Sequence, residues 1–143
     1  IALAIENAKE IVESGHTAFK MDPMMHSSWD GNNGGNIGYL DGEISPEGAY
    51  RAEQITAEIR DAVGPDIEIL IDAHGKFNVP TAIDLANRLS AYDIHWFEEP
   101  VPPDNIDSMA LVASKTSIPI ATGERLSTKY EFSKVIEKKA ASI

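Results

Sequence analysis

The fold is decided by three short apolar runs that each end in an acidic residue: Ile67-Glu68-Ile69-Leu70-Ile71-Asp72, Ile94-His95-Trp96-Phe97-Glu98 and Ile118-Pro119-Ile120-Ala121-Thr122-Gly123-Glu124. The three final acids follow one another at steps of 26 residues. Short runs rich in Ile, Leu and aromatic residues, followed by turn residues, are typical of buried parallel strands. About two dozen residues or more are used by one strand, one helix and two loops in a βαβ unit. The spacing therefore predicts three successive parallel strands, each with a carboxylate at its C-terminal end.

Helices are expected before, between and after these strands. Apolar side chains recur at helical spacing within residues 1–14, 46–63, 80–89, 106–115 and 128–139. Ser45 and Pro46 form a favourable helix start, because a capping hydroxyl precedes a proline in the first turn. A further strand is expected at 17–21, and Ile143 opens another. Strict alternation of strand and helix predicts a parallel α/β fold.

The number of strands points to a partial (β/α)8 barrel. A complete (β/α)8 barrel takes roughly 250 residues, whereas this chain has 143 and four predicted strands. We therefore expect about half of a barrel, with four parallel strands alternating with helices. Active sites of such barrels lie at the C-terminal ends of the strands. Three carboxylates converging there would repel one another, and oxygen ligands of this kind favour a hard divalent cation, most simply Mg²⁺.

The composition argues against several classes of function. The net charge of −11 makes a nucleic acid or an anionic membrane a poor main partner. The absence of cysteine excludes disulfides, thiolate metal sites and a cysteine nucleophile. No apolar stretch approaches the roughly 20 residues of a transmembrane helix, and no glycine-rich phosphate loop follows a strand. We expect a cytoplasmic protein that acts on a small molecule, without a nucleic-acid or membrane partner.

Three motifs resemble the enolase superfamily: Ile71-Asp72-Ala73-His74-Gly75, Trp96-Phe97-Glu98-Glu99-Pro100 and Ala121-Thr122-Gly123-Glu124-Arg125. They are most similar to its mandelate racemase/muconate lactonizing enzyme branch, and within that branch to sugar-acid dehydratases of the galactonate dehydratase type. The resemblance covers residues 1–143, from the first barrel helix to the start of the sixth strand. It implies a fragment of the C-terminal barrel domain, without the capping domain and the last barrel strands. It also implies that Asp72, Glu98 and Glu124 are Mg²⁺ ligands.

The resemblance also implies a reaction, in which a proton α to a carboxylate is removed. The resulting enediolate is doubly charged, and a divalent cation on the substrate carboxylate stabilises that charge as it develops. His74 lies two residues beyond Asp72, so on an extended strand it points the same way. A histidine there resembles the general acid that protonates the departing β-hydroxyl, since imidazole donates a proton near neutral pH. The alternative is a histidine that only hydrogen-bonds a ligand carboxylate.

Lys20 ends the first strand, in the segment Phe19-Lys20-Met21-Asp22-Pro23. Racemases and cycloisomerases that this chain resembles carry Lys-x-Lys here, and Asp22 at the second position argues against a lysine-based racemase. We expect Lys20 to act in catalysis as an electrostatic partner of the substrate carboxylate. Asp22 is expected either to bind a substrate hydroxyl or to serve as a turn residue before Pro23.

Three further residues complete the candidate site. Arg125 follows a predicted metal ligand and is expected to bind substrate or a neighbouring carboxylate. Trp29 belongs to a long loop, residues 22–43, of a length typical of functional lids, and is a candidate substrate contact. Neighbouring strand residues point to opposite faces. Glu99 is therefore expected on the face away from Glu98, as an outer hydrogen-bond or salt-bridge partner.

The sequence favours Mg²⁺-dependent dehydration of an aldonic or related sugar acid to a 2-keto-3-deoxy product, by a longer parent enzyme. A racemase, epimerase or cycloisomerase on the same scaffold is one alternative. Another is a catalytically incomplete half-barrel, since the base of the family pattern lies on strands that this chain does not contain. Unpaired edge strands invite pairing with another chain. We therefore expect a homo-oligomer, with two halves closing into a barrel-like dimer.

Overall fold

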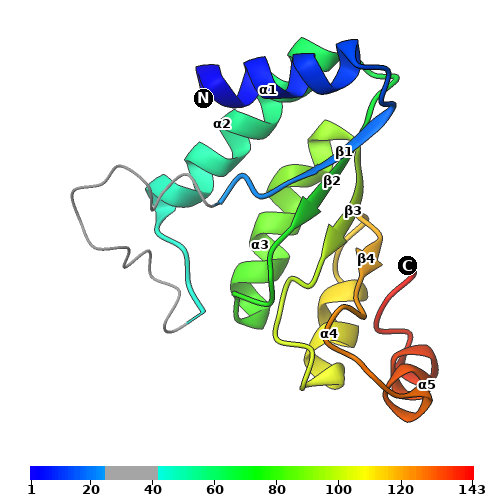
Figure 1. Ribbon diagram of the computed structural model, residues 1–143. Helices are drawn as coiled ribbons and strands as arrows, with labels where there is room; N and C mark the ends of the chain where they lie inside the picture. Colours follow the sequence, from blue (N-terminus) through cyan, green and yellow to red (C-terminus); the bar gives the residue numbers. More distant parts are fainter. Residues whose placement is uncertain (25–41) are drawn as a thin grey trace.

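The computed structural model describes residues 1–24 and 42–143 (Figure 1). Its elements are, in chain order, α1 (Ala2–Glu13), β1 (Ala18–Met21), α2 (Pro46–Val63), β2 (Glu68–Asp72), α3 (Val79–Leu89), the 3-10 turn η2 (Ser90–Tyr92), β3 (Ile94–Glu98), α4 (Ile106–Ala113), β4 (Ile120–Ala121) and α5 (Lys129–Lys138). The predicted alternation of helix and strand is confirmed. Trp29 lies outside the described residues, and its role as a substrate contact stays a prediction.

The four strands form one parallel sheet in the order β1-β2-β3-β4. Sequential neighbours that all run parallel are the arrangement of a (β/α)8 barrel. Asp72 pairs with Glu98 in register, and Glu98 pairs with Ala121. The C-terminal ends of β2, β3 and β4 therefore lie side by side. The expectation of an α/β fold with four parallel strands of a partial barrel is confirmed.

No strand is assigned at Ile143, where one was expected to open, but the last residues of the chain lie beside β4. The amides of Ser142 and Ile143 donate hydrogen bonds to the carbonyl of Ile120, at 2.8 Å and 3.2 Å. The amide of Thr122 donates to the carbonyl of Ile143 at 3.2 Å. Two of these bonds share the Ile120 carbonyl, and the bonds of Ile143 and Thr122 run in the two directions found in a parallel ladder.

The hydrophobic core lies between the sheet and the helices. Its strand residues, Ile69, Ile71 and Phe97, are fully buried and pack with residues of α2, α3 and α4. Because strand side chains alternate, Lys20, Asp72 and Glu98 point to the other face. That face corresponds to the interior of a barrel.

Local signals explain where the helices begin. Ser45 caps α2 by accepting a hydrogen bond from the amide of Gly48, and Asn78 caps α3 by accepting one from Thr81. Thr128 and Glu131 form a capping box at the start of α5. The Asn78 cap places the first residue of α3 at Val79, one residue before the predicted start.

Two expectations about the C-terminal third are corrected. The strand expected at 118–121 comprises only Ile120–Ala121, since Pro119 has no amide to donate to the ladder. The helix expected at 106–115 ends at Ala113. On α5, Val135 is buried, whereas Phe132 and Ile136 are exposed.

Arg60, near the end of α2, joins several loops at the N-terminal end of the sheet. Its guanidinium donates to the carbonyls of Gly64 and Ile67 from one nitrogen and to those of Tyr92 and Asp93 from the other two. The four distances lie between 2.6 Å and 3.0 Å. Arg60 thereby fixes the starts of β2 and β3, at the end of the sheet opposite the three acidic residues.

Candidate metal centre

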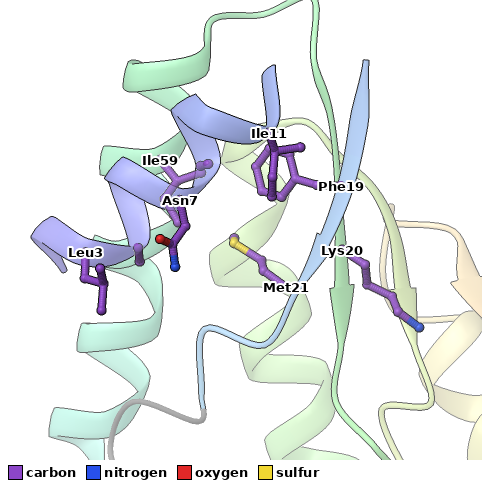
Figure 2. Close-up of a pocket in the computed structure, with 9 residues that line it drawn as sticks. Leu3, Asn7, Ile11, Phe19, Lys20, Met21 and Ile59 are labelled. Carbon is purple, nitrogen blue, oxygen red and sulfur yellow. The ribbon is translucent and has the colours of Figure 1, made fainter. Parts of the chain in front are cut away.

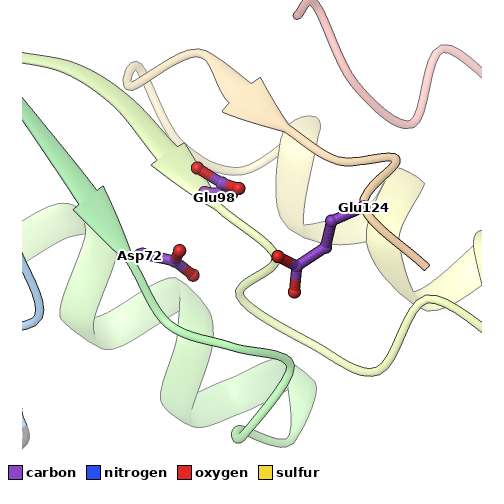
Figure 3. A group of neighbouring side chains, drawn as sticks. All are labelled: Asp72, Glu98 and Glu124. Atoms are coloured by element: carbon purple, nitrogen blue, oxygen red, sulfur yellow. The ribbon is translucent and has the colours of Figure 1, made fainter. Parts of the chain in front are cut away.

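Three carboxylates meet at the C-terminal end of the sheet. Asp72 ends β2, Glu98 ends β3, and Glu124 lies in the loop that follows β4. One oxygen from each lies within 4.8 Å of the other two. Figure 3 shows the Glu124 carboxylate turned toward the strand ends that carry the other two. The structure thus brings together the residues that the 26-residue spacing predicts to converge, and their role as metal ligands stays a prediction.

The donor set fits a hard divalent cation. All three donors are carboxylate oxygens, which Mg²⁺ and Ca²⁺ prefer over nitrogen and sulfur. Oxygens on opposite sides of a Mg²⁺ ion, at about 2.1 Å each, are about 4 Å apart. The observed spread of up to 4.8 Å is slightly wider, so a small rotation of the side chains would close the site on Mg²⁺.

Lys20 lies beside two of these acids. Its Nζ is 2.9 Å from Asp72 Oδ2 and 2.9 Å from Glu98 Oε2. Hydrogen bonds to these two carboxylates raise the pKa of Lys20 above its ordinary value, so the side chain is an ammonium at neutral pH. Trp96 Nε1 also donates to Glu98 Oε2 at 3.2 Å. Two donors therefore fix the orientation of the Glu98 carboxylate.

His74 reaches the site by a route that differs from the expected one. Strand β2 ends at Asp72, and His74 has φ +54°, so it lies in a left-handed turn and not on an extended strand. Its amide donates to Asp72 Oδ1 at 3.0 Å, which holds this turn against the carboxylate. The ring still faces the acids, with Nδ1 3.3 Å from Asp22 Oδ2 and 3.5 Å from Asp72 Oδ1. Its role as a general acid stays a prediction.

Asp22 is a turn residue with a second set of partners. Its Oδ1 accepts a hydrogen bond from the amide of Met24 at 3.0 Å, which is the contact of an Asx-turn. Its Oδ2 lies 2.6 Å from Lys76 Nζ. Sequence reasoning missed Lys76, although it stands two residues after His74 in the same loop. Binding of a substrate hydroxyl by Asp22 stays a prediction.

Glu99 and Arg125 form a pair behind the acidic trio. Glu99 is fully buried, with Oε1 accepting from Thr122 Oγ1 at 3.2 Å and Oε2 2.9 Å from Arg125 Nη1. The latter contact is an ion pair whose N–H direction does not meet hydrogen-bond geometry. Burial raises the pKa of Glu99, and the Arg125 charge opposes that shift. The salt bridge expected for Glu99 is present, and a substrate contact for Arg125 stays a prediction.

A separate hollow of about 260 Å³ lies between α1 and β1. Figure 2 shows Leu3 and Ile11 of α1 on the same side as Phe19 and Met21 of β1, while the Lys20 ammonium extends away from them. The lining of this hollow is mostly apolar and includes no acidic residue. The candidate chemistry therefore lies at the strand ends.

Comparison with known proteins places the chain in a family. The sequence model described as Enolase C-terminal domain-like matches residues 3–143. The chain belongs to this family. The chain is 39% identical over 121 residues to a D-gluconate dehydratase of Thermoproteus tenax. It is 40% identical over 77 residues to a D-galactarolactone cycloisomerase of Agrobacterium fabrum. It superposes with a TM-score of 0.84 and 35% identity on the crystal structure of a mandelate racemase/muconate lactonizing enzyme-like protein from Rubrobacter xylanophilus.

These three proteins are much longer than this chain. The matches cover 85%, 54% and 96% of the chain, but only 22%, 20% and 34% of the three proteins. The resemblance to sugar-acid dehydratases of the enolase superfamily is confirmed at the level of homology. The proposed domain boundaries stay a prediction. Among the described residues, the helices are all too short or too polar to cross a membrane.

Proposed function

We propose that the chain is part of a Mg²⁺-dependent sugar-acid dehydratase, which removes a proton α to the substrate carboxylate and eliminates the β-hydroxyl. The observation that carries the proposal is the convergence of Asp72, Glu98 and Glu124 within 4.8 Å at the ends of parallel strands. The D-gluconate dehydratase among the relatives supports this class of substrate and reaction.

The three carboxylates would hold the cation, and Lys20 would contact the substrate carboxylate. A bound Mg²⁺ supplies positive charge that stabilises the substrate carboxylate as the α-proton leaves. Lys20 adds a second positive charge from the β1 side. Lys20, whose ammonium lies 2.9 Å from Asp72 and from Glu98, would act as an electrostatic partner and not as a base.

His74 would give the proton to the departing hydroxyl. Its Nδ1 faces Asp22 and Asp72, so we assign proton donation to Nε2. Asp22, held by Lys76 and by the Met24 amide, would orient the ring or contact a hydroxyl of the sugar acid. The base that removes the α-proton is expected from a part of the parent enzyme outside this chain.

Calorimetric titration with Mg²⁺ tests the metal centre. Wild type is expected to bind Mg²⁺ saturably, and Asp72→Asn is expected to lose that binding while keeping a similar shape. Asp107→Asn is the matched control, because Asp107 is an exposed acid on α4 that pairs with Lys138. The longer parent enzyme is then assayed for a keto product from aldonic acids. Equal Mg²⁺ affinity in wild type and Asp72→Asn would refute the proposed site.

A cycloisomerase is the second candidate, and one relative favours it: the D-galactarolactone cycloisomerase that matches 54% of the chain. The sequence argues against this reading, because Asp22 replaces the second lysine of Lys-x-Lys. The two reactions are separated by their products. Loss of water from an open-chain aldonic acid supports the dehydratase, whereas interconversion of a lactone without loss of water supports the cycloisomerase.

A further inference from the structure

Arg125 lies where three loops meet at the C-terminal end of the sheet. Its Nη1 is 2.9 Å from Glu99 Oε2, in the loop after β3. Its Nη2 donates to the carbonyl of His74 at 3.0 Å, in the loop after β2. The same nitrogen is 3.4 Å from Glu124 Oε1, in the loop after β4. A planar guanidinium with several donors suits this geometry, whereas the single ammonium of lysine does not.

We propose that Arg125, anchored by Glu99, is a positioning residue that holds Glu124 and the His74 turn in the geometry that binds the divalent cation. The inference rests on the proposed metal centre. It assigns Arg125 a role toward the protein's own ligands that does not require contact with substrate.

The anchor of this arrangement is rigid. Glu99 is fully buried, and a buried carboxylate without a cationic partner is costly, so the Arg125 guanidinium is held close to it. The backbone of Glu99 is fixed on both sides. Its amide donates to the carbonyl of Ala121 at 2.9 Å, and its carbonyl accepts from the amide of Gly75 at 2.7 Å. Arg125 is therefore tied to a point that cannot move without disturbing two neighbouring segments.

The loop after β2 is shaped to admit the guanidinium. A β-carbon added at Gly75 would lie 2.5 Å from Arg125 Nη1, and Gly75 has φ +66°, which disfavours other residues. The hydrogen bond from Arg125 then reaches the carbonyl of His74, directly before this glycine. Because the His74 amide donates to Asp72 Oδ1, the same turn connects Arg125 to a second proposed ligand.

If Arg125 positions the ligands, removing it should weaken cation binding, whereas the loss of its charge alone should strengthen cation binding. Removing a positive charge beside Glu124 should strengthen cation binding by Coulomb's law. Removing a group that orients metal ligands typically weakens metal affinity by about 10- to 100-fold. Weaker binding in an Arg125 variant would therefore be evidence for positioning.

The experiment measures Mg²⁺ affinity by calorimetry and the Mn²⁺ electron paramagnetic resonance spectrum of wild type, Arg125→Ala and Arg125→Lys. Circular dichroism checks folding. If Arg125→Ala fails to fold, Arg125→Lys, which keeps a charge beside Glu99, carries the test. Arg88→Ala and Arg88→Lys are matched controls, because Arg88 pairs with Asp84 and Glu53 on the helical side of the fold.

We expect Arg125→Ala to bind Mg²⁺ about 10- to 100-fold more weakly, with an altered Mn²⁺ spectrum and partial recovery on adding guanidinium ions. Arg125→Lys should lie between Arg125→Ala and wild type. Unchanged or tighter binding in both variants would overturn the inference. A wild type that binds no Mg²⁺ would overturn the proposed metal centre and the inference with it. If the parent enzyme binds Mg²⁺ but dehydrates no sugar acid, the proposed reaction fails, and weaker binding in the Arg125 variants still supports the inference.

Discussion

The Lys20 ammonium occupies oxygens that a cation would also use, so Lys20→Met should bind Mg²⁺ more tightly than wild type. Lys20 Nζ lies 2.9 Å from one oxygen of Asp72 and 2.9 Å from one oxygen of Glu98. Methionine keeps most of the side-chain volume and removes the positive charge. The substitution therefore frees two proposed ligands and removes a charge that repels the incoming cation.

The size of the effect follows from distance and exposure. Two unit charges 4 Å apart interact by about 1 kcal/mol in water and by about 4 kcal/mol at an effective dielectric constant of 20. The Lys20 side chain is 42% exposed, which places it toward the solvent-screened end of that range. A change of about 1 to 2 kcal/mol corresponds to Mg²⁺ binding that is about 5- to 30-fold tighter.

The assay is calorimetric titration of the chain with Mg²⁺ at low ionic strength, repeated in about 1 M salt, where surface charge interactions are strongly screened. Lys115→Met is the control, since Lys115 is exposed in the turn after α4 and its loss changes the net charge equally. In the parent enzyme, Lys20→Met should also lower turnover, because the substrate carboxylate loses an electrostatic partner. Weaker Mg²⁺ binding in Lys20→Met would refute this prediction and would indicate that Lys20 holds Asp72 and Glu98 in position for the cation.

Three further predictions concern stability and assembly. Arg60→Ala should lower the free energy of unfolding by roughly 2 to 6 kcal/mol, since four hydrogen bonds to carbonyls are lost at about 0.5–1.5 kcal/mol each. Chemical denaturation measures this, and a loss no larger than that of Arg51→Ala, an exposed residue on the same helix, would contradict it. Hydrogen bonds from Thr128 and Ser127 lower the pKa of Glu131, so its stabilising contribution is present above the ordinary carboxyl range and disappears as pH falls through its folded-state pKa. Thermal melts should therefore show a deficit of Glu131→Gln relative to wild type at pH 7 that shrinks as the pH falls through the carboxyl range, whereas a deficit that does not change with pH would exclude this origin. The sheet has β1 at one edge and β4, beside which only the last residues of the chain lie, at the other, so the isolated chain is expected to self-associate at micromolar concentration, and a single monomeric species in light scattering would count against that.

The sequence predicted those features that depend on local pattern. Strand and helix alternation follows from short apolar runs and helical periodicity, and both are properties of neighbouring residues. The convergence of the three acids followed because parallel strands end at the same edge of the sheet. The convergence of Asp72, Glu98 and Glu124 could be predicted from this rule of topology and from their constant spacing in the sequence.

Several specific side-chain contacts between distant segments were not predicted. Lys76 pairs with Asp22 across 54 residues of sequence, and no local pattern shows which of several lysines completes such a pair. Arg60 reaches carbonyls of residues 92 and 93, and these backbone groups carry no side-chain signal. The left-handed turn at His74 was missed for a different reason. A histidine at positive φ is unusual, and the turn is stabilised by its amide bond to Asp72 and by Arg125, 51 residues away.

The balance of charge at the strand ends gives a further argument for a divalent cation. Two ion pairs near the site balance themselves, Asp22 with Lys76 and Glu99 with Arg125. Arg125 also lies 3.4 Å from Glu124, but its charge is matched by Glu99, so the Lys20 ammonium is left to balance the three acids among the described contacts, and two negative charges remain in excess. Like charges this close destabilise one another strongly unless a counter-ion is bound. One divalent cation would neutralise the excess. Lys20 should oppose cation binding because its charge acts directly on the three acids. The Arg125 charge is already paired with Glu99, so Arg125 can support cation binding by orienting the ligands.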